Sequence, residues 1–492
     1  MENVSSVQKQ GGRVRRKLKN HYYYYQETRS SALDVEQSHP TLMIRDRGLS
    51  DLSLLPGDNN PQEIQNFLFF RTVTAPSLAG GCDFGLWTCH TLQASRLYPP
   101  LWHATTALGA IHRQFIADGN LLPYNPRSET VDRVRFALRQ FNESIQSLTK
   151  MLSSGKALGK QDKVVVLTSC ILFMCLCTLQ GYQLQALMHI SHGVKLMHEW
   201  GLGESSVVQR DDTDAALNML LVMLTQLDTQ GTHIQSRVGI QTTEQIEDRQ
   251  SVYALEPFHT CLQAYVGLEK LINRLTRLDL NTHGASATHK EAILHDFTLW
   301  DAMFQDYLAT RSETIEGNLL AVLNIRRLYA QTLFNDPAKG EVGYDEFIDQ
   351  YTMIVTLAAQ VLEAIYPDTR DVDAQSGNVS SPSKQPDYSL SVVISEAIFI
   401  TAMRCREPSL RRRALQLLKR YPRREGIMNG TAATEILENY MLCEEQTCTG
   451  SLADNGRCSS DGLWICQKHR VDFQRFMDIS RLGVQGMQKW RT

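Results

Sequence analysis

The pattern of apolar and polar positions predicts helices along most of this chain. One helix is marked by apolar side chains that follow one another three or four residues apart: Val131, Val134, Leu138, Phe141, Ile145, Leu148 and Leu152. This spacing places them on one stripe of a helix, while charged side chains such as Arg139 and Glu143 face elsewhere. Ser128 is suited to cap the start of this helix, and Gly155 to end it.

The next predicted helix is apolar all round. It covers the 16 residues from Val164 to Leu179, among which the polar side chains are only hydroxyls. Because a helix needs about 20 apolar residues to cross a bilayer, we expect a buried core helix rather than a membrane span. Gly181 then interrupts the chain, and a third helix follows up to about Gly201. Three helices with short connections imply antiparallel neighbours that pack together.

The rest of the chain continues this pattern. Further helices are predicted at about 257–278, 290–311, 314–335, 344–366, 389–404, 408–420, 430–445 and 470–488, and loops near 203–214, 230–251 and 368–390. Sustained alternation of apolar and polar residues, which would indicate strands, is absent, and so is a repeat of fixed period. We therefore expect an all-α fold, an irregular array of packed antiparallel helices with a disordered N-terminal tail.

Three regions are predicted from the composition along the chain. Residues 1–60 form a polar, basic and tyrosine-rich tail, 61–445 the helical body with a flexible insert at about 368–390, and 446–492 a cysteine-containing loop with a final helix. The basic run of the tail consists of Arg13, Arg15, Arg16, Lys17 and Lys19, and four tyrosines follow it. Such a run is compatible with a nuclear import signal, with contacts to nucleic acid, or with an inert solvated tail.

Length, composition, net charge and cysteine count limit the classes of function that this chain can have. The chain has 492 residues, 42% of them hydrophobic, and a net charge of −3, so its overall charge does not favour nucleic acid binding. Eleven cysteines, an odd number, several of them in apolar surroundings, indicate reduced thiols in the nucleus or cytosol. The N-terminal residues show no apolar segment typical of a signal peptide, so we expect no secretion.

The best candidates for metal ligands lie near the C-terminus. Cys443 and Cys448 form one close pair, and Cys466 and His469 another, in the range of spacings that zinc sites use. Two such pairs also arise by chance in a chain with this many cysteines, so we expect no cofactor, with structural zinc as the alternative.

No catalytic signature is apparent. The motifs of zinc proteases, of hydrolases with a serine nucleophile and of dinucleotide-binding proteins are all absent, and we expect that the protein is not an enzyme. His103 and His112 are interpreted as structural histidines. His189 and His192, three residues apart, are interpreted as residues of a helix surface. The arginines at 411–413 and 423–424 are interpreted as a helix surface paired with glutamates and carbonyl groups.

Several segments occur in an order typical of one family. An aromatic run from Phe67 to Phe70 precedes an acidic-aromatic turn from Asp83 to Trp87, the string Leu92–Ser95, and a helix-like segment after Pro99 and Pro100. Further segments are Gln180–Gly181 followed by a helix to Leu196, and the arginine-rich stretch from Cys405 to Gly426. In this order they resemble the regulatory domain of fungal zinc-binuclear-cluster transcription factors.

The resemblance covers about residues 60–445 and implies a helical regulatory domain in a nuclear regulator of transcription. In that family a six-cysteine module ahead of this domain reads DNA, and the factors commonly control one metabolic or secondary-metabolite gene cluster. Here the first cysteine is Cys82, so we expect either that such a module lies outside this sequence or that the protein acts through a partner. We therefore expect a homodimer or a heterodimer with a related factor, indirect contact with DNA, and no membrane. The alternative is a cytosolic helical scaffold for protein interactions with no role in transcription.

Overall fold

The structure is a computed structural model of the chain. It describes residues 60–80, 85–117, 128–155, 157–202, 212–238, 257–280, 287–310, 317–366, 387–390, 393–448, 464–467, 469–473 and 476. The basic tail with Arg13, Arg15, Arg16, Lys17 and Lys19 therefore lies outside the described residues, as do most of the predicted insert at 368–390 and most of the last helix expected at 470–488.

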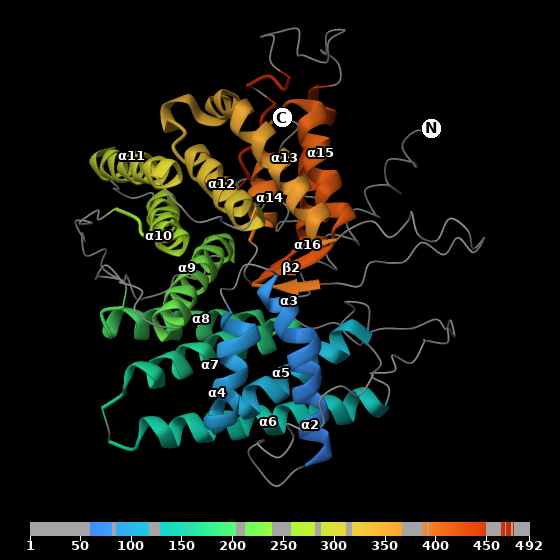
Figure 1. Ribbon diagram of the computed structural model, residues 1–492. Helices are drawn as coiled ribbons and strands as arrows, with labels where there is room; N and C mark the ends of the chain where they lie inside the picture. Colours follow the sequence, from blue (N-terminus) through green and yellow to red (C-terminus); the bar gives the residue numbers. More distant parts are fainter. Residues whose placement is uncertain are drawn as a thin grey trace, which may run out of the picture.

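The described residues confirm the all-α prediction (Figure 1). Helices of the first half lie at the bottom of Figure 1, in blue and green, and the later helices lie at the top, in yellow and orange. The first half comprises α2 (Pro61–Phe69), α3 (Ala75–Ala79), α4 (Thr91–Leu97), α5 (Pro99–Ala117), α6 (Ser128–Leu152), α7 (Lys160–Leu179) and α8 (Gln183–Glu199), with single π-helical turns at Phe70–Thr74 and Leu86–His90.

The first half is organised around α5 and α7. Large aromatic side chains are buried here, since Phe67, Phe70, Trp87 and Trp102 are each at most 3% exposed, while Phe69 is half-buried. Gly109 lies where α5 meets α2, and a Cβ atom there would come within 2.2 Å of the carbonyl oxygen of Asn66. The close approach of these two helices therefore requires glycine at this position.

The apolar helix α7 is central, as predicted. Its length and mean hydropathy would allow α7 to cross a membrane, but 89% of its most apolar stretch is buried inside the protein. All 16 residues from Val164 to Leu179 are buried, which identifies α7 as a core helix. Gly181, at a φ of 81°, makes the turn into α8, and Gly201, at 61°, follows the end of α8.

The second half begins with a helix longer than expected. It contains α9 (Asp212–Val238), α10 (Cys261–Leu280), α11 (Ala287–Thr310), α12 (Gly317–Thr332), α13 (Ile348–Ile365), α14 (Ser395–Arg404), α15 (Pro408–Arg420) and α16 (Gly430–Cys448), and a 3₁₀ segment at Pro337–Phe347. The predicted start of a loop at 230 is wrong, because α9 continues to Val238. Thr229 and Gln230 are buried in this helix, and the polar side chains in this part of the sequence led to the prediction of a loop.

A small sheet joins the two halves, and the sequence did not indicate it. β1 (Asp387–Ser389) pairs in parallel with β2 (Arg423–Glu425), which pairs antiparallel with β3 (Met428–Asn429). The backbone of β1 accepts a hydrogen bond of 2.7 Å from Ser77 of the first half. Strands of two or three residues are too short to show alternation, which explains why they were missed.

The interior is continuous from one end of the described chain to the other. A single cluster of buried apolar side chains runs from Phe70 in the first half to Phe476 near the C-terminus. The segment around residues 464–476 therefore packs on the helical body. The domain boundaries drawn from the sequence stay predictions.

Candidate functional site

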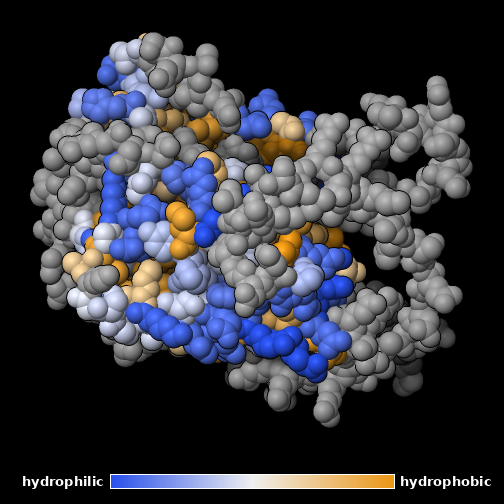
Figure 2. Space-filling view, turned by 60° about the horizontal axis from the view of Figure 1, so that its bottom comes forward, coloured by the Kyte–Doolittle hydropathy of each residue, from blue (hydrophilic) through white to orange (hydrophobic). Residues whose placement is uncertain are grey.

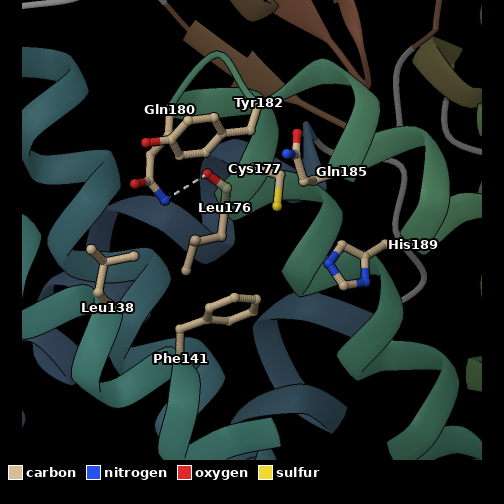
Figure 3. A pocket seen from close by; sticks show the side chains of 8 residues that line it. All are labelled: Leu138, Phe141, Leu176, Cys177, Gln180, Tyr182, Gln185 and His189. Atoms are coloured by element: carbon tan, nitrogen blue, oxygen red, sulfur yellow. Dashed lines mark hydrogen bonds between the residues drawn. The ribbon is translucent and has the colours of Figure 1, made fainter.

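An open apolar pocket lies between α6, α7 and α8 (Figure 3). Its volume is about 250 Å³. The lining residues are Leu138 and Phe141 from α6, Leu176 and Cys177 from α7, Gln180 and Tyr182 from the turn, and Gln185 and His189 from α8. Helices α6 and α7 meet here through large side chains, because the rings of Phe141 and Phe173 are 4.9 Å apart.

The described lining of this pocket is uncharged at neutral pH. Burial, with a smaller contribution from His192, lowers the pKa of His189 to about 4, so its imidazole is neutral. The His189 ring lies 5.5 Å from the ring of Phe173 and 6.3 Å from that of Phe141. Burial raises the pKa of the Cys177 thiol to about 11, which removes its reactivity as a thiolate. The pocket is suited to apolar groups rather than to acid–base chemistry.

The predictions for the histidines hold in part. His103 accepts or donates a 2.7 Å hydrogen bond with Gln140, and buried His112 makes one of 3.0 Å with Thr74, so both are structural as predicted. His192 is exposed on α8, in agreement with a helix surface. His189 is instead half-buried among aromatic rings, because its helix turns that side towards α6.

The buried charges form ion pairs between distant segments. Arg326 is fully buried on α12, and its guanidinium donates two hydrogen bonds of 2.7 Å to Glu269 of α10. It donates a third, of 2.8 Å, to Glu396 of α14. His233 on α9 also contacts Glu396, at 3.0 Å. Burial alone would raise the pKa of Glu396, but His233 and Arg326 together hold it at about 2. Four helices are connected through one buried network.

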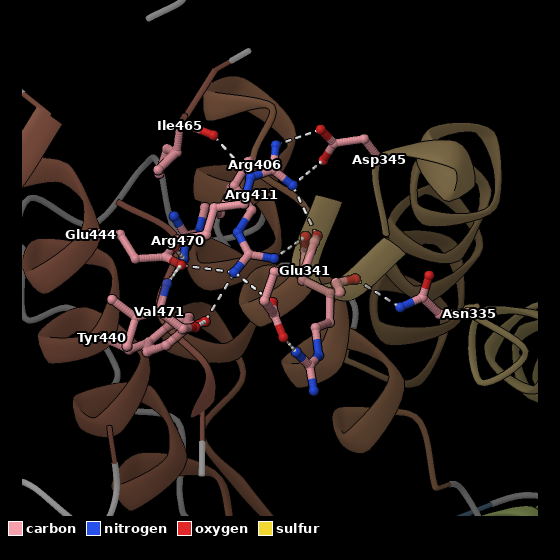
Figure 4. Close-up of polar contacts among 12 residues, drawn as sticks. Asn335, Glu341, Asp345, Arg406, Arg411, Tyr440, Glu444, Ile465, Arg470 and Val471 are labelled. Carbon is pink, nitrogen blue, oxygen red and sulfur yellow. Dashed lines mark hydrogen bonds and ion pairs between the residues drawn. The ribbon is translucent and has the colours of Figure 1, made fainter. Parts of the chain in front are cut away.

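A second network fixes the C-terminal segment (Figure 4). Arg406 donates to Glu444 at 2.7 Å and to Glu341 at 2.8 Å, and Arg411 donates to the other oxygen of Glu444 at 2.7 Å. Burial alone would raise the pKa of Glu444, but Arg406 and Arg411 hold it below its usual value. Glu444 also accepts the backbone N–H of Val471 at 3.0 Å.

The arginine interpretation is corrected by these contacts. Glutamates and carbonyl groups are the partners, as expected, but Arg411 is buried rather than on a helix surface. Arg423 and Arg424 lie on strand β2 and are also buried, and Arg424 donates to the carbonyl of Thr178 at 3.1 Å. Arg412 and Arg413 are exposed on α15, as expected, and Arg412 pairs with Glu445 at 2.8 Å. These side chains hold elements together and are not a phosphate site.

The predicted zinc ligands are brought together in part. The Cys466 sulfur lies 2.8 Å from the Nδ1 atom of His469, as the close spacing suggested. Cys443 is half-buried on α16, and burial raises the pKa of its thiol. Cys448 is the last residue of α16. Within the described part of the chain, no three His, Cys, Asp or Glu side chains are grouped so that they could hold a metal ion. The zinc site stays a prediction.

Comparison with known proteins gives one distant relative. The chain is similar to the aspercryptin biosynthesis cluster-specific transcription regulator atnN of Emericella nidulans. The two are 20% identical over 427 residues, which cover 70% of this chain and 67% of that regulator. No family model matches the sequence, and no solved structure matches it. This all-helical chain is therefore similar, over most of its length, to a regulator of transcription.

Proposed function

We propose that this protein is a nuclear regulator of transcription that controls a metabolic or secondary-metabolite gene cluster. The observation that carries the proposal is the similarity to a cluster-specific transcription regulator over most of both chains. The long helical body and the ordered segments shared with fungal zinc-cluster factors support it. That relative is a regulator of transcription, which supports a function without catalysis.

We propose further that the chain reaches promoters through a partner. Arg406, Arg411, Arg423 and Arg424 are buried in contacts within the protein, so these four side chains do not face a phosphate backbone. The basic run at Arg13–Lys19 is proposed as an import signal. A homodimer or a heterodimer with a related factor is the proposed assembly, and we propose that it works without a cofactor, with structural zinc as the alternative.

The test is chromatin occupancy of the C-terminally tagged full chain in the native host. Discrete promoter peaks, together with altered transcripts of one gene cluster after deletion of the gene, are the expected result. An untagged strain is the control for background. Cytosolic fluorescence with no enrichment over that control would contradict the proposal and favour a cytosolic interaction scaffold. Substitution of the five basic residues of the tail by serine is expected to reduce nuclear fluorescence.

A further inference from the structure

The C-terminal segment, residues 464–476, lies on the second half in the manner of a bound peptide (Figure 4). Its described residues from 464 to 472 belong to no helix or strand. In the described part of the segment, its own backbone hydrogen bonds form a turn after Cys466 and one helical turn from Asp472 to Phe476. Contacts with the helical body therefore fix most of its conformation.

Two consecutive residues of the segment are recognised by polar groups of the body. The Arg470 guanidinium forms a bidentate ion pair with Asp345 of the 3₁₀ segment, in which one nitrogen lies 2.9 Å from its carboxylate oxygen. The N–H of Val471 donates to Glu444 at 3.0 Å, and its carbonyl accepts a hydrogen bond from the Tyr440 hydroxyl. One side chain and one stretch of main chain are thus paired, as in the recognition of an extended peptide.

Two aromatic side chains anchor the end of the segment. Phe473 and Phe476 are 4% and 5% exposed. The ring of Phe473 lies 5.5 Å from that of Tyr440 and 5.8 Å from that of Phe399 on α14, and the ring of Phe476 lies 5.3 Å from that of Tyr440. On the face that Figure 2 shows, the described residues expose hydrophobic groups in small areas among hydrophilic ones. The aromatic pair is therefore the apolar anchor of this contact.

The groups that receive the segment are held in place by the body itself. Arg406 and Arg411 donate to the two oxygens of Glu444 at 2.7 Å each, and Arg406 also donates to the Tyr440 hydroxyl at 3.0 Å. Burial raises the pKa of Tyr440, so its phenol keeps the proton that it donates. A surface arranged before binding loses less conformational entropy when a peptide binds. We call it the segment-binding surface, and it consists of Asp345, Phe399, Tyr440 and Glu444.

We propose that the segment-binding surface is a peptide-recognition site, which residues 464–476 occupy in this structure and from which a partner's peptide of the same chemistry displaces them. The partner peptide carries an arginine for Asp345, then a β-branched residue, and aromatic residues two and five positions further on. An acidic residue in place of the arginine would meet Asp345 with the same charge, so acidic peptides are excluded. The inference does not depend on the proposed role in transcription.

Attachment to the same chain sets the affinity that permits exchange. Residues 449–463 connect the segment to α16, and a connection of this length gives an effective concentration of about 1 mM. A dissociation constant of about 1 to 10 μM for the free segment then leaves the surface empty in about 0.1 to 1% of molecules. Because a second peptide binds this empty form, its apparent affinity for the wild type is about 100- to 1000-fold lower.

Hydrogen exchange of the purified full chain tests whether the segment leaves its surface. The amide of Val471, which Glu444 protects, is expected to exchange at least about tenfold faster than the amide of Tyr440 within α16. The physical reason is that detachment of the segment exposes Val471 while the helix stays folded. Equal exchange at the two amides would mean that the segment leaves only when α16 unfolds, and would overturn the proposal.

Fluorescence anisotropy with a labelled synthetic peptide of residues 464–476, under reducing conditions, tests recognition. Arg470→Asp in the full chain places like charges together at Asp345, so its own segment is released. This variant is expected to bind the peptide with a dissociation constant of about 1 to 10 μM, and the wild type at least about 100-fold more weakly. No binding to the released variant would overturn the proposal.

A charge exchange separates specific recognition from general adhesion. Asp345→Arg also releases the segment, but it is expected to bind the peptide only when the peptide itself carries Arg470→Asp. Asp301 of α11 makes a similar bidentate ion pair with Arg327 at a similar exposure, so Asp301→Arg is the matched control and should bind like the wild type. Equal binding of both peptides to Asp345→Arg would show that Asp345 does not select the arginine, which contradicts the proposed site.

Discussion

At the scale of single residues, the largest consequence is expected at Arg326. Replacing it by methionine leaves Glu269 and Glu396 buried without their guanidinium partner. An uncompensated buried charge costs about 3–5 kcal/mol of folding free energy. Urea unfolding followed by circular dichroism measures this loss. The neighbouring Arg327 pairs with partly exposed Asp301, so Arg327→Met is expected to cost at most about 1 kcal/mol. Equal losses for the two variants would contradict a special role of the buried network.

His189 gives the protein a pH dependence with a defined sign. Its pKa is about 4 in the folded protein against 6.5 for a free side chain. Between pH 6.5 and 4 the unfolded chain binds a proton that the folded chain does not, so the stability present above pH 6.5 falls as the pH decreases. After screening at this half-buried site we expect a loss of about 1–2 kcal/mol.

The measurement is urea unfolding at several pH values between 6.5 and 4. His189→Gln is expected to remove this part of the dependence, while His192→Gln, on the exposed neighbour, should retain most of it. An unchanged slope in His189→Gln would show that another group causes the loss.

At the scale of elements, the sequence predicted the helices that are marked by a local pattern of residues. The all-round apolar helix α7 was placed to within a few residues, and so was α15, where Pro408 and the side chain of Glu407 define the start. The polar residues within α9 obscured its length. The strands were missed because pairing of β1 with β2 joins segments more than thirty residues apart, and no local spacing reports such a contact.

Of the candidate site, the sequence predicted only the stripe of apolar residues on the helix that is now α6. The α6 positions were predicted to share one face, but their exposure depends on which other helices cover them. The network of Arg326, Glu269 and Glu396 comes from three helices, so its members look like ordinary surface charges in the sequence. Buried pairing of this kind requires the tertiary fold, which explains why Arg411 was also assigned to a surface.

The packing of α2 on α5 makes a prediction of its own. Gly109→Ala adds a Cβ atom that would lie 2.2 Å from the Asn66 carbonyl oxygen, so the two helices must separate. Although alanine favours a helix by about 1 kcal/mol over glycine, we expect a net loss of about 1–3 kcal/mol from overpacking. The control Gly231→Ala meets only the end of Leu187, at 3.1 Å, and should be near neutral. Unfolding midpoints in urea compare the two, and a stabilised Gly109→Ala would contradict the close approach.

At the scale of the whole molecule, the two halves meet through the packing of α9 on α7 and α8 and through the short sheet, and long-range contacts hold the C-terminal segment. The short sheet receives Ser77 from the first half, and Arg424 of β2 donates to the end of α7. The C-terminal segment contributes Val471 to the Glu444 network. The sheet contacts therefore hold β1 and β2 against α3 and α7 of the first half.

The same arrangement predicts how far a local defect spreads. Phe473 is 4% exposed, and its ring lies 5.5 Å from that of Tyr440 on α16 and 5.8 Å from that of Phe399 on α14. Phe473→Ala is expected to cost about 3–5 kcal/mol through the cavity it leaves. Hydrogen exchange should then show lost protection in α14 and α16 first, with α6 to α8 retained, because local opening starts in the elements that contact the altered side chain. Leu442→Ala, at the 51% exposed Leu442 of α16, is the control and should leave exchange unchanged. Equal loss of protection in α7 would mean that the halves unfold as one unit, coupled through the packing of α9 on α7 and through the short sheet.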